Sequence, residues 1–167
     1  MLDFDFVINK DLFEKIKSLK EKTNIGLSKL IREIIIFMIP FLRKKHLFEK
    51  RREKDYKIIN ATHKIRVYLP KEVYNELKMV HDQINSFSIA TLVRELLETY
   101  FSGIENYGEK NFINIVSKLK KIIEGLKEKK TRLVKSGATD IPFPLEEEDY
   151  FWLKFKSNFT LKEIKFL

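Results

Sequence analysis

Two short segments of the chain alternate apolar and polar residues, which is the pattern of a β-strand with one buried face. They are residues 3–8 (DFDFVI) and residues 64–69 (KIRVYL). We predict that Phe4–Ile8 and Ile65–Leu69 form neighbouring antiparallel strands. The inward positions of this pair are Phe4, Phe6, Ile65 and Val67.

After each strand segment the apolar residues recur at the spacing of an amphipathic helix, and a polar turn divides each helical stretch in two. Gly26 and Ser88 stand where the second helix of each pair should begin, and Asn24 suits a left-handed turn residue, a role that Ser86 would have in the later stretch. The apolar stripes are Leu12, Ile16 and Leu19; Leu27, Leu30, Ile31, Ile34 and Ile35; Val73, Leu77, Val80 and Ile84; and Ile89, Leu92, Val93, Leu96, Leu97 and Tyr100.

These two strand–helix–helix stretches are an internal repeat. Residues 6–17 read FVINKDLFEKIK, and residues 67–78 read VYLPKEVYNELK. Further along, LIREI at 30–34 matches LVREL at 92–96. The offset is 61 residues at the first match and 62 at the second, so one residue has been gained between them.

The repeated unit resembles the ribbon-helix-helix fold of the Arc, MetJ and CopG repressors, over residues 2–39 and 65–101, about half of the chain. The resemblance implies two interlocked units whose paired strands enter the major groove of DNA. It also implies that the start of the second helix binds phosphate. Carried onto this chain, the DNA-binding residues are Lys64, Arg66 and Tyr68 on the strand and Phe87, Ser88 and Ile89 at the helix start.

The first repeat carries Asp3, Asp5 and Val7 at the outward positions, where carboxylates would be repelled by phosphate. Two pairings are open. Pairing within one chain gives a single-chain pseudodimer with Asp5 opposite Arg66, whereas pairing between two chains of a homodimer places like charges opposite one another. Opposite charges stabilise cross-strand pairs and like charges destabilise them, so we favour the pseudodimer.

The remaining sequence divides into a connector, residues 41–63, and a C-terminal segment, residues 103–167, beside the two repeats at 1–40 and 64–102. The connector carries eight Lys or Arg against three acids and should be helical up to about Lys57. Its cations form either a phosphate-contacting arm or the solvated face of a helix. The candidate contacts are Arg43, Lys44, Lys45, Arg51 and Arg52.

In the C-terminal segment, residues 102–110 (SGIENYGEK) indicate a loop and Asn111–Val134 a long amphipathic helix. A strand should follow at Tyr150–Lys156, then a turn at Ser157 and Asn158. The last piece is either a second strand of a β-hairpin or a short helix, because Thr160 and Glu163 have the spacing of a capping box. The expected fold class is therefore mainly α with short β.

Composition narrows the function. The chain has 167 residues, of which 44% are hydrophobic, and 33 Lys plus Arg against 24 Asp plus Glu give a formal net charge of +9. This basic excess favours an anionic partner, most often nucleic acid and less often a membrane surface. There are no cysteines, which excludes disulfides and Cys-based zinc sites and suits a cytoplasmic protein.

Residues 34–42, the longest apolar run, are too few to span a bilayer, so no membrane association is expected. His46, His63 and His81 lack metal-ligand spacing, and the sequence has no phosphate-binding glycine loop or nucleophile motif. We therefore expect neither an enzyme nor a cofactor. Two functions remain open: a regulator of transcription that binds double-stranded DNA, and an interaction module whose C-terminal segment binds a protein partner.

Overall fold

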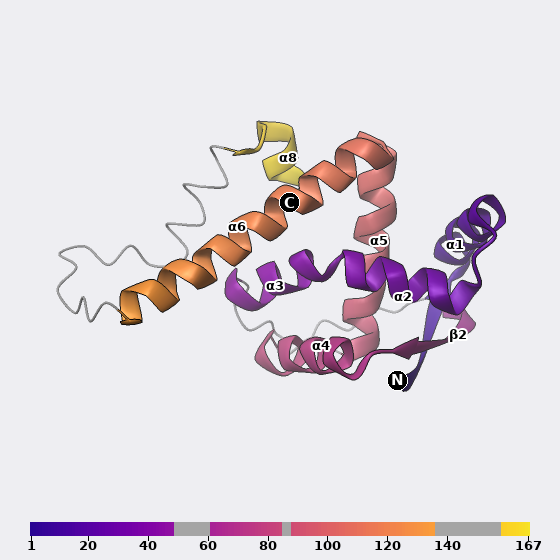
Figure 1. Ribbon diagram of the computed structural model, residues 1–167. Helices are drawn as coiled ribbons and strands as arrows, with labels where there is room; N and C mark the ends of the chain where they lie inside the picture. The colour runs from indigo at the N-terminus through magenta and orange to yellow at the C-terminus, as the bar shows by residue number, and fades with distance from the viewer. Residues whose placement is uncertain (49–60, 85–87, 136–157) are drawn as a thin grey trace. The chain divides into compact units, whose positions relative to one another are not determined.

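The computed structural model describes residues 1–48, 61–84, 88–135 and 158–167. The chain forms two compact units, Met1–Gly108 and Glu109–Leu167. The described part is mainly helical with a two-stranded antiparallel sheet, which confirms the predicted fold class at that level (Figure 1). The elements are β1 (Leu2–Asn9), α1 (Lys10–Thr23), α2 (Leu27–Phe37), α3 (Ile39–Phe48), β2 (Ala61–Leu69), α4 (Lys71–Ile84), α5 (Ile89–Tyr107), α6 (Glu109–Lys135) and α8 (Leu161–Phe166).

The two strands pair in the predicted way. β1 is antiparallel to β2, in a continuous register from Leu2 opposite Leu69 to Ile8 opposite His63. The inward side chains of Phe6, Ile65 and Val67 are buried, and Phe4 is half-buried with its ring centroid 5.5 Å from that of Phe6. The strand prediction is therefore confirmed, with β2 beginning at Ala61, before the predicted segment.

Local capping explains where the helices of the first unit begin and end. The Asn9 side chain accepts a hydrogen bond of 2.8 Å from the Leu12 N–H at the start of α1, and Asn24 ends that helix with a φ of 56°. Gly26 and Ser88 are the N-cap residues of α2 and α5, and Ser88 Oγ accepts from the Thr91 N–H at 3.1 Å. These positions agree with the sequence; Ser86 lies outside the described residues.

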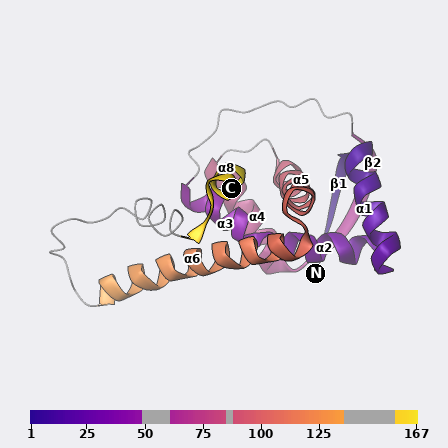
Figure 2. The same cartoon turned by 90° about the horizontal axis from the view of Figure 1, so that it is seen from above.

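The core of the first unit lies between the ribbon and the helices that follow each strand. Most of the described residues of the predicted apolar stripes belong to it, and Ile16, Ile31, Leu77 and Val93 are fully buried. α2 and α5 cross and contact each other, while α1 contacts α2 and α4 contacts α5 (Figures 1 and 2). Each repeat therefore buries its stripes partly against the other repeat.

The predicted loop at residues 102–110 is wrong, because every residue of it except Gly108 is helical. α5 continues through Gly103 to Tyr107, and only Gly108, with a φ of 79°, separates it from α6. A glycine inside a helix costs about 1 kcal/mol relative to alanine, which the packing of a long apolar face can offset. Gly103 is buried on α5, where the lack of a side chain suits a packed position.

The connector is helical from Ile39 to Phe48, which is α3. Pro40 lies in the first turn of this helix, where the backbone N–H that proline lacks would have no partner within the helix. Residues 49–57 of the predicted helix lie outside the described residues. The predicted amphipathic helix is confirmed as α6, which runs from Glu109 to Lys135.

The second unit packs α8 against α6. The rings of Phe112 and Phe166 meet edge to face at 6.2 Å, and Lys118 Nζ lies 3.5 Å from the Asn158 carbonyl oxygen. Thr160 and Glu163 form both hydrogen bonds of a capping box, so the helical alternative for the last segment is confirmed. The predicted strand at 150–156 lies outside the described residues.

Candidate nucleic-acid interface

The side of the ribbon opposite the core carries six exposed side chains, which we call the outer ribbon face. They are Asp3, Asp5 and Val7 on β1 and Lys64, Arg66 and Tyr68 on β2. The strict alternation of both strands places them there, because the intervening residues face the core. In the register, Asp3 lies opposite Tyr68, Asp5 opposite Arg66, and Val7 opposite Lys64.

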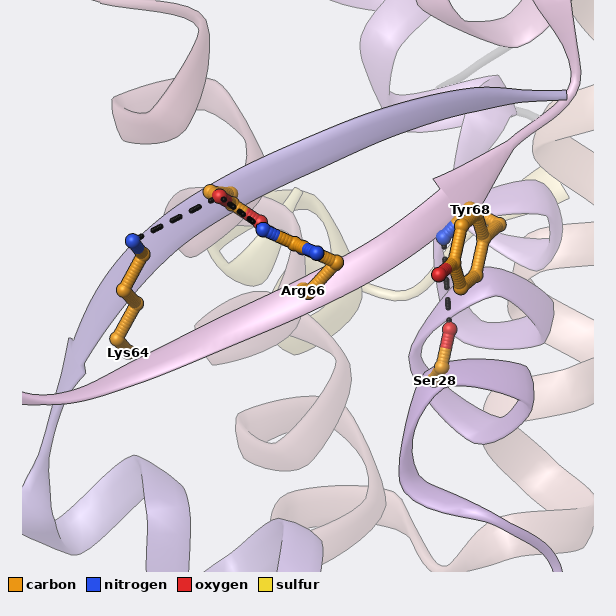
Figure 3. Close-up of polar contacts among 5 residues, drawn as sticks. Ser28, Lys64, Arg66 and Tyr68 are labelled. Carbon is orange, nitrogen blue, oxygen red and sulfur yellow. Dashed lines mark hydrogen bonds and ion pairs between the residues drawn. The ribbon is translucent and has the colours of Figure 1, made fainter.

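An ion pair occupies the centre of the outer ribbon face. Arg66 Nε donates to Asp5 Oδ1 at 2.9 Å and Nη2 to Oδ2 at 3.3 Å, and Lys64 Nζ lies 3.7 Å from Oδ2 (Figure 3). The predicted opposition of Asp5 and Arg66 is confirmed. The Arg66 hydrogen bonds lower the pKa of Asp5, and the carboxylate raises the pKa of Arg66.

The face as a whole is electrically balanced. Its two carboxylates, Asp3 and Asp5, offset its two cations, Lys64 and Arg66. The positive charge of the chain therefore lies elsewhere on it. For this face to attract an anion, Arg66 must release Asp5 or hydrogen-bond to Asp5 and the anion at the same time.

Two arginines fix the helices to the ribbon, and each connects a helix of one repeat to the strand of the other repeat. Arg32 of α2 donates to the Tyr68 carbonyl oxygen on β2 at 3.4 Å, and Arg94 of α5 donates to the Val7 carbonyl oxygen on β1 at 3.0 Å. Arg32 and Arg94 are the arginines of the repeated LIREI and LVREL motifs, and Val7 and Tyr68 are also matched positions of the repeat. Each repeat thus holds the strand of the other through the same contact.

The start of α2 also touches the ribbon. Ser28 is the second residue of α2, and its Oγ accepts a hydrogen bond of 3.4 Å from the Tyr68 N–H on β2 (Figure 3). The backbone N–H groups of a first helical turn have no partner within the helix, so they carry partial positive charge. Here they stand beside the basic strand of the ribbon.

Several other predicted residues lie away from the outer ribbon face. Arg43 and Lys44 lie on α3, which follows the end of α2 remote from Ser28, about 16 Å along that helix. Arg43 Nη2 is 3.1 Å from Glu76 Oε1 of α4, and Lys44 is half-buried. The structure does not bring these two residues onto the ribbon.

Of the predicted helix start, Ser88 caps α5 and Ile89 is its first residue; both are half-buried. Phe87, Arg51 and Arg52 lie outside the described residues, as does the side chain of Lys45. The sequence interpretation missed Arg32 and Arg94, although their recurrence in the matched motifs was a usable signal.

Burial lowers the pKa of Arg94, and Glu98 and Glu95 oppose that change.

Among the described residues, no group of three or more His, Cys, Asp or Glu side chains could hold a metal ion. No helix in the described ranges has the length and apolar character needed to cross a bilayer. Comparisons with protein-family models, curated proteins and solved structures gave no significant match.

The central ion pair makes a prediction about pH. Asp5 should titrate below its ordinary pKa of 3.8, because Arg66 stabilises the carboxylate. The contribution of this pair to stability is then complete above pH 3.8 and is lost as the pH falls through the lower, folded-state pKa. Carbonyl-detected NMR titration of Asp5 measures the value directly.

Substitution separates the causes of that shift. Arg66→Gln should return the Asp5 pKa most of the way to 3.8, whereas Lys64→Gln should change it less, since the hydrogen bond from Arg66 is the largest cause. An Asp5 pKa that is equal in wild type and Arg66→Gln would show that the pair does not form in solution.

Proposed function

We propose that this chain binds double-stranded DNA as a tandem ribbon-helix-helix pseudodimer and regulates transcription by placing the β1–β2 ribbon in the major groove. The observation that carries the proposal is the exposed row of Lys64, Arg66 and Tyr68 on a two-stranded antiparallel ribbon. The reciprocal contacts of Arg32 and Arg94 support it, because interlocked repeats must hold each other's strands.

The dimensions of the ribbon suit the groove. Paired strands lie about 4.8 Å apart, and the major groove of B-DNA is about 12 Å wide. A ribbon with its side chains can therefore enter it, with alternate residues directed at base edges. Lys64 and Arg66 can donate to guanine O6 and N7, and Tyr68 can donate through its hydroxyl or contact a thymine methyl group.

The rest of the chain supplies the attraction for phosphate. The outer ribbon face is balanced, so the net charge of +9 comes from the rest of the chain, and it would raise the rate and strength of association with a polyanion. The first turn of α2, held against β2 through Ser28, offers N–H groups to a phosphate beside the ribbon.

One observation favours a second function, an interaction module that binds a protein partner. Asp5 takes two hydrogen bonds from Arg66, the residue best suited to read a base, and it would also repel phosphate. A balanced face with Val7 and Tyr68 exposed resembles the mixed polar and apolar surface of a protein-binding site. The DNA proposal requires Arg66 to exchange or share this partner.

Removing the charge of Asp5 distinguishes the two functions. Asp5→Asn keeps the size of the side chain, releases Arg66 and relieves repulsion from phosphate. For a DNA-binding protein it should tighten binding to duplex DNA at low salt roughly fivefold, the effect of about one unit charge near phosphate in water. The melting temperature should change little, because exposed ion pairs contribute little.

Fluorescence anisotropy with a labelled duplex, across a salt series, measures this change. Glu105→Gln is the matched control, since it removes the same charge from an exposed position near the end of α5. Undetectable duplex binding by wild type and Asp5→Asn at about 50 mM salt would reject DNA binding. Weaker binding by Asp5→Asn than by wild type would make the carboxylate itself a reader, for example of cytosine N4.

A further inference from the structure

We propose that the DNA target is an asymmetric site, bound by a single chain, in which the base contacts come from β2 and not from β1. This inference rests on the proposed DNA binding and specifies its substrate. It follows from a comparison of the positions that the internal repeat makes equivalent.

The ribbon has an approximate two-fold axis that can be located from two independent observations. The strand register places Asp5 opposite Arg66. The sequence repeat, with its offset of 61 residues, makes the same two residues equivalent. The axis relating the repeats therefore passes through this pair, and it also relates the Arg32–Tyr68 contact to the Arg94–Val7 contact.

The inner face of the ribbon obeys this symmetry. Three inward positions of β1 are apolar and match apolar positions of β2. The equivalent pairs are Phe4 and Ile65, Phe6 and Val67, and Ile8 and Leu69. The first helices continue the pattern, since Leu12 and Ile16 match the buried Val73 and Leu77.

The outer ribbon face breaks the symmetry at all three positions. Asp3 is equivalent to Lys64, Asp5 to Arg66 and Val7 to Tyr68. The charge reverses at two positions, and at the third a hydrogen-bonding phenol replaces an aliphatic side chain. A palindromic site presents identical edges to the two halves of a symmetric protein. This face would meet those identical edges with opposite chemistry.

The base pairs on the two sides of the centre therefore meet different surfaces, because the register places Lys64 beside Val7 at one end of the ribbon and Tyr68 beside Asp3 at the other. Lys64 and Arg66 offer donors to guanine, the contact most often used for specific readout. Asp3 offers only acceptors and is repelled by the phosphates that line the groove. Because both strands come from one chain, one chain supplies a complete ribbon, and no second copy is needed to fill the groove.

Selection from a duplex library with about 20 random base pairs tests this inference. Wild type should enrich a motif without dyad symmetry, in which the positions facing Lys64 and Tyr68, on opposite sides of the centre, prefer different bases. Native mass spectrometry on the minimal enriched site should give one chain per duplex. A variant with Asp3→Lys, Asp5→Arg and Val7→Tyr makes both strands alike, so it should enrich a palindrome instead.

A second variant guards against misfolding from like charges at the ribbon centre. Asp3→Lys with Val7→Tyr leaves the Asp5–Arg66 pair intact and gives both ends of the ribbon a Lys and a Tyr, so it should make the base preferences on the two sides of the centre more alike. If wild type enriches a palindrome, unpatterned sequences, or a site holding two chains, the inference is wrong although DNA binding stands. If wild type and both variants fail to bind any duplex at about 50 mM salt, the proposed function itself is wrong.

Discussion

Replacing Phe6 by alanine should lower the free energy of unfolding of the first unit by about 3–5 kcal/mol, the usual cost of removing a buried phenylalanine from a core. Phe6 is 3% exposed at the centre of the inner ribbon face. Since domains are stable by only about 5–15 kcal/mol, this loss should be large in denaturant titrations followed by circular dichroism.

The distribution of the loss matters as much as its size. If the repeats share one core, Phe6→Ala should reduce amide exchange protection in α4 and α5 as much as in α1 and α2. Val7→Ala is the matched control at the next, exposed position, and should cost about 1 kcal/mol or less. Loss of protection confined to α1 and α2 would show that the repeats fold separately. Phe6→Leu gives a milder version if the alanine variant does not fold.

The sequence predicts the ribbon and its helices well because each depends on short-range physics. Strand alternation identifies the buried face at Phe6 and Val67, and the repeat identifies which segments correspond. Opposite charges at Asp5 and Arg66 then favour pairing within one chain, and the register places these two residues opposite each other. Caps such as Ser88 and the Thr160–Glu163 box are recognisable because they are local hydrogen-bonding patterns.

The features that the sequence does not reveal depend on tertiary packing. Gly103 is a helix breaker by propensity, yet it lies inside α5 because the helix buries that face. Arg43 is one of many cations in a basic connector, and only the folded chain shows its partner to be Glu76. The roles of Arg32 and Arg94 require knowing that each helix crosses to the strand of the other repeat.

The outer ribbon face lies between these cases. Its six side chains follow from alternation, so the sequence identifies them correctly. Their function does not follow, because it depends on how the Asp5–Arg66 pair is shared when a ligand arrives. The hydrogen bonds to Asp5, at 2.9 and 3.3 Å, hold the Arg66 side chain across the ribbon, so that it does not project away from it. Direct readout therefore requires this arginine to change partners in the groove.

If the chain binds DNA as proposed, removing Arg66 should sharply reduce discrimination at one base position of the duplex. In the Asp5→Asn background, where no carboxylate holds the guanidinium, Arg66→Ala should reduce the preference for guanine at that position roughly fivefold to 150-fold. Duplexes carrying each of the four base pairs at every position, compared by competition anisotropy, give this ratio. The background removes the complication that Arg66→Ala alone would leave Asp5 uncompensated in the groove and weaken all duplexes.

Lys29→Ala is the control for this prediction, because Lys29 is exposed in the first turn of α2, next to the contact between Ser28 and β2. If Lys29 contacts a phosphate, Lys29→Ala should weaken binding to all duplexes alike and reduce the salt slope of binding by about 1, without altering the ranking of base pairs. If the Arg66→Ala double variant instead keeps the wild-type ranking at every position, Arg66 reads no base. Lys64, Arg66 and Tyr68 would then serve only to position the ribbon against the DNA phosphates, or to bind a protein.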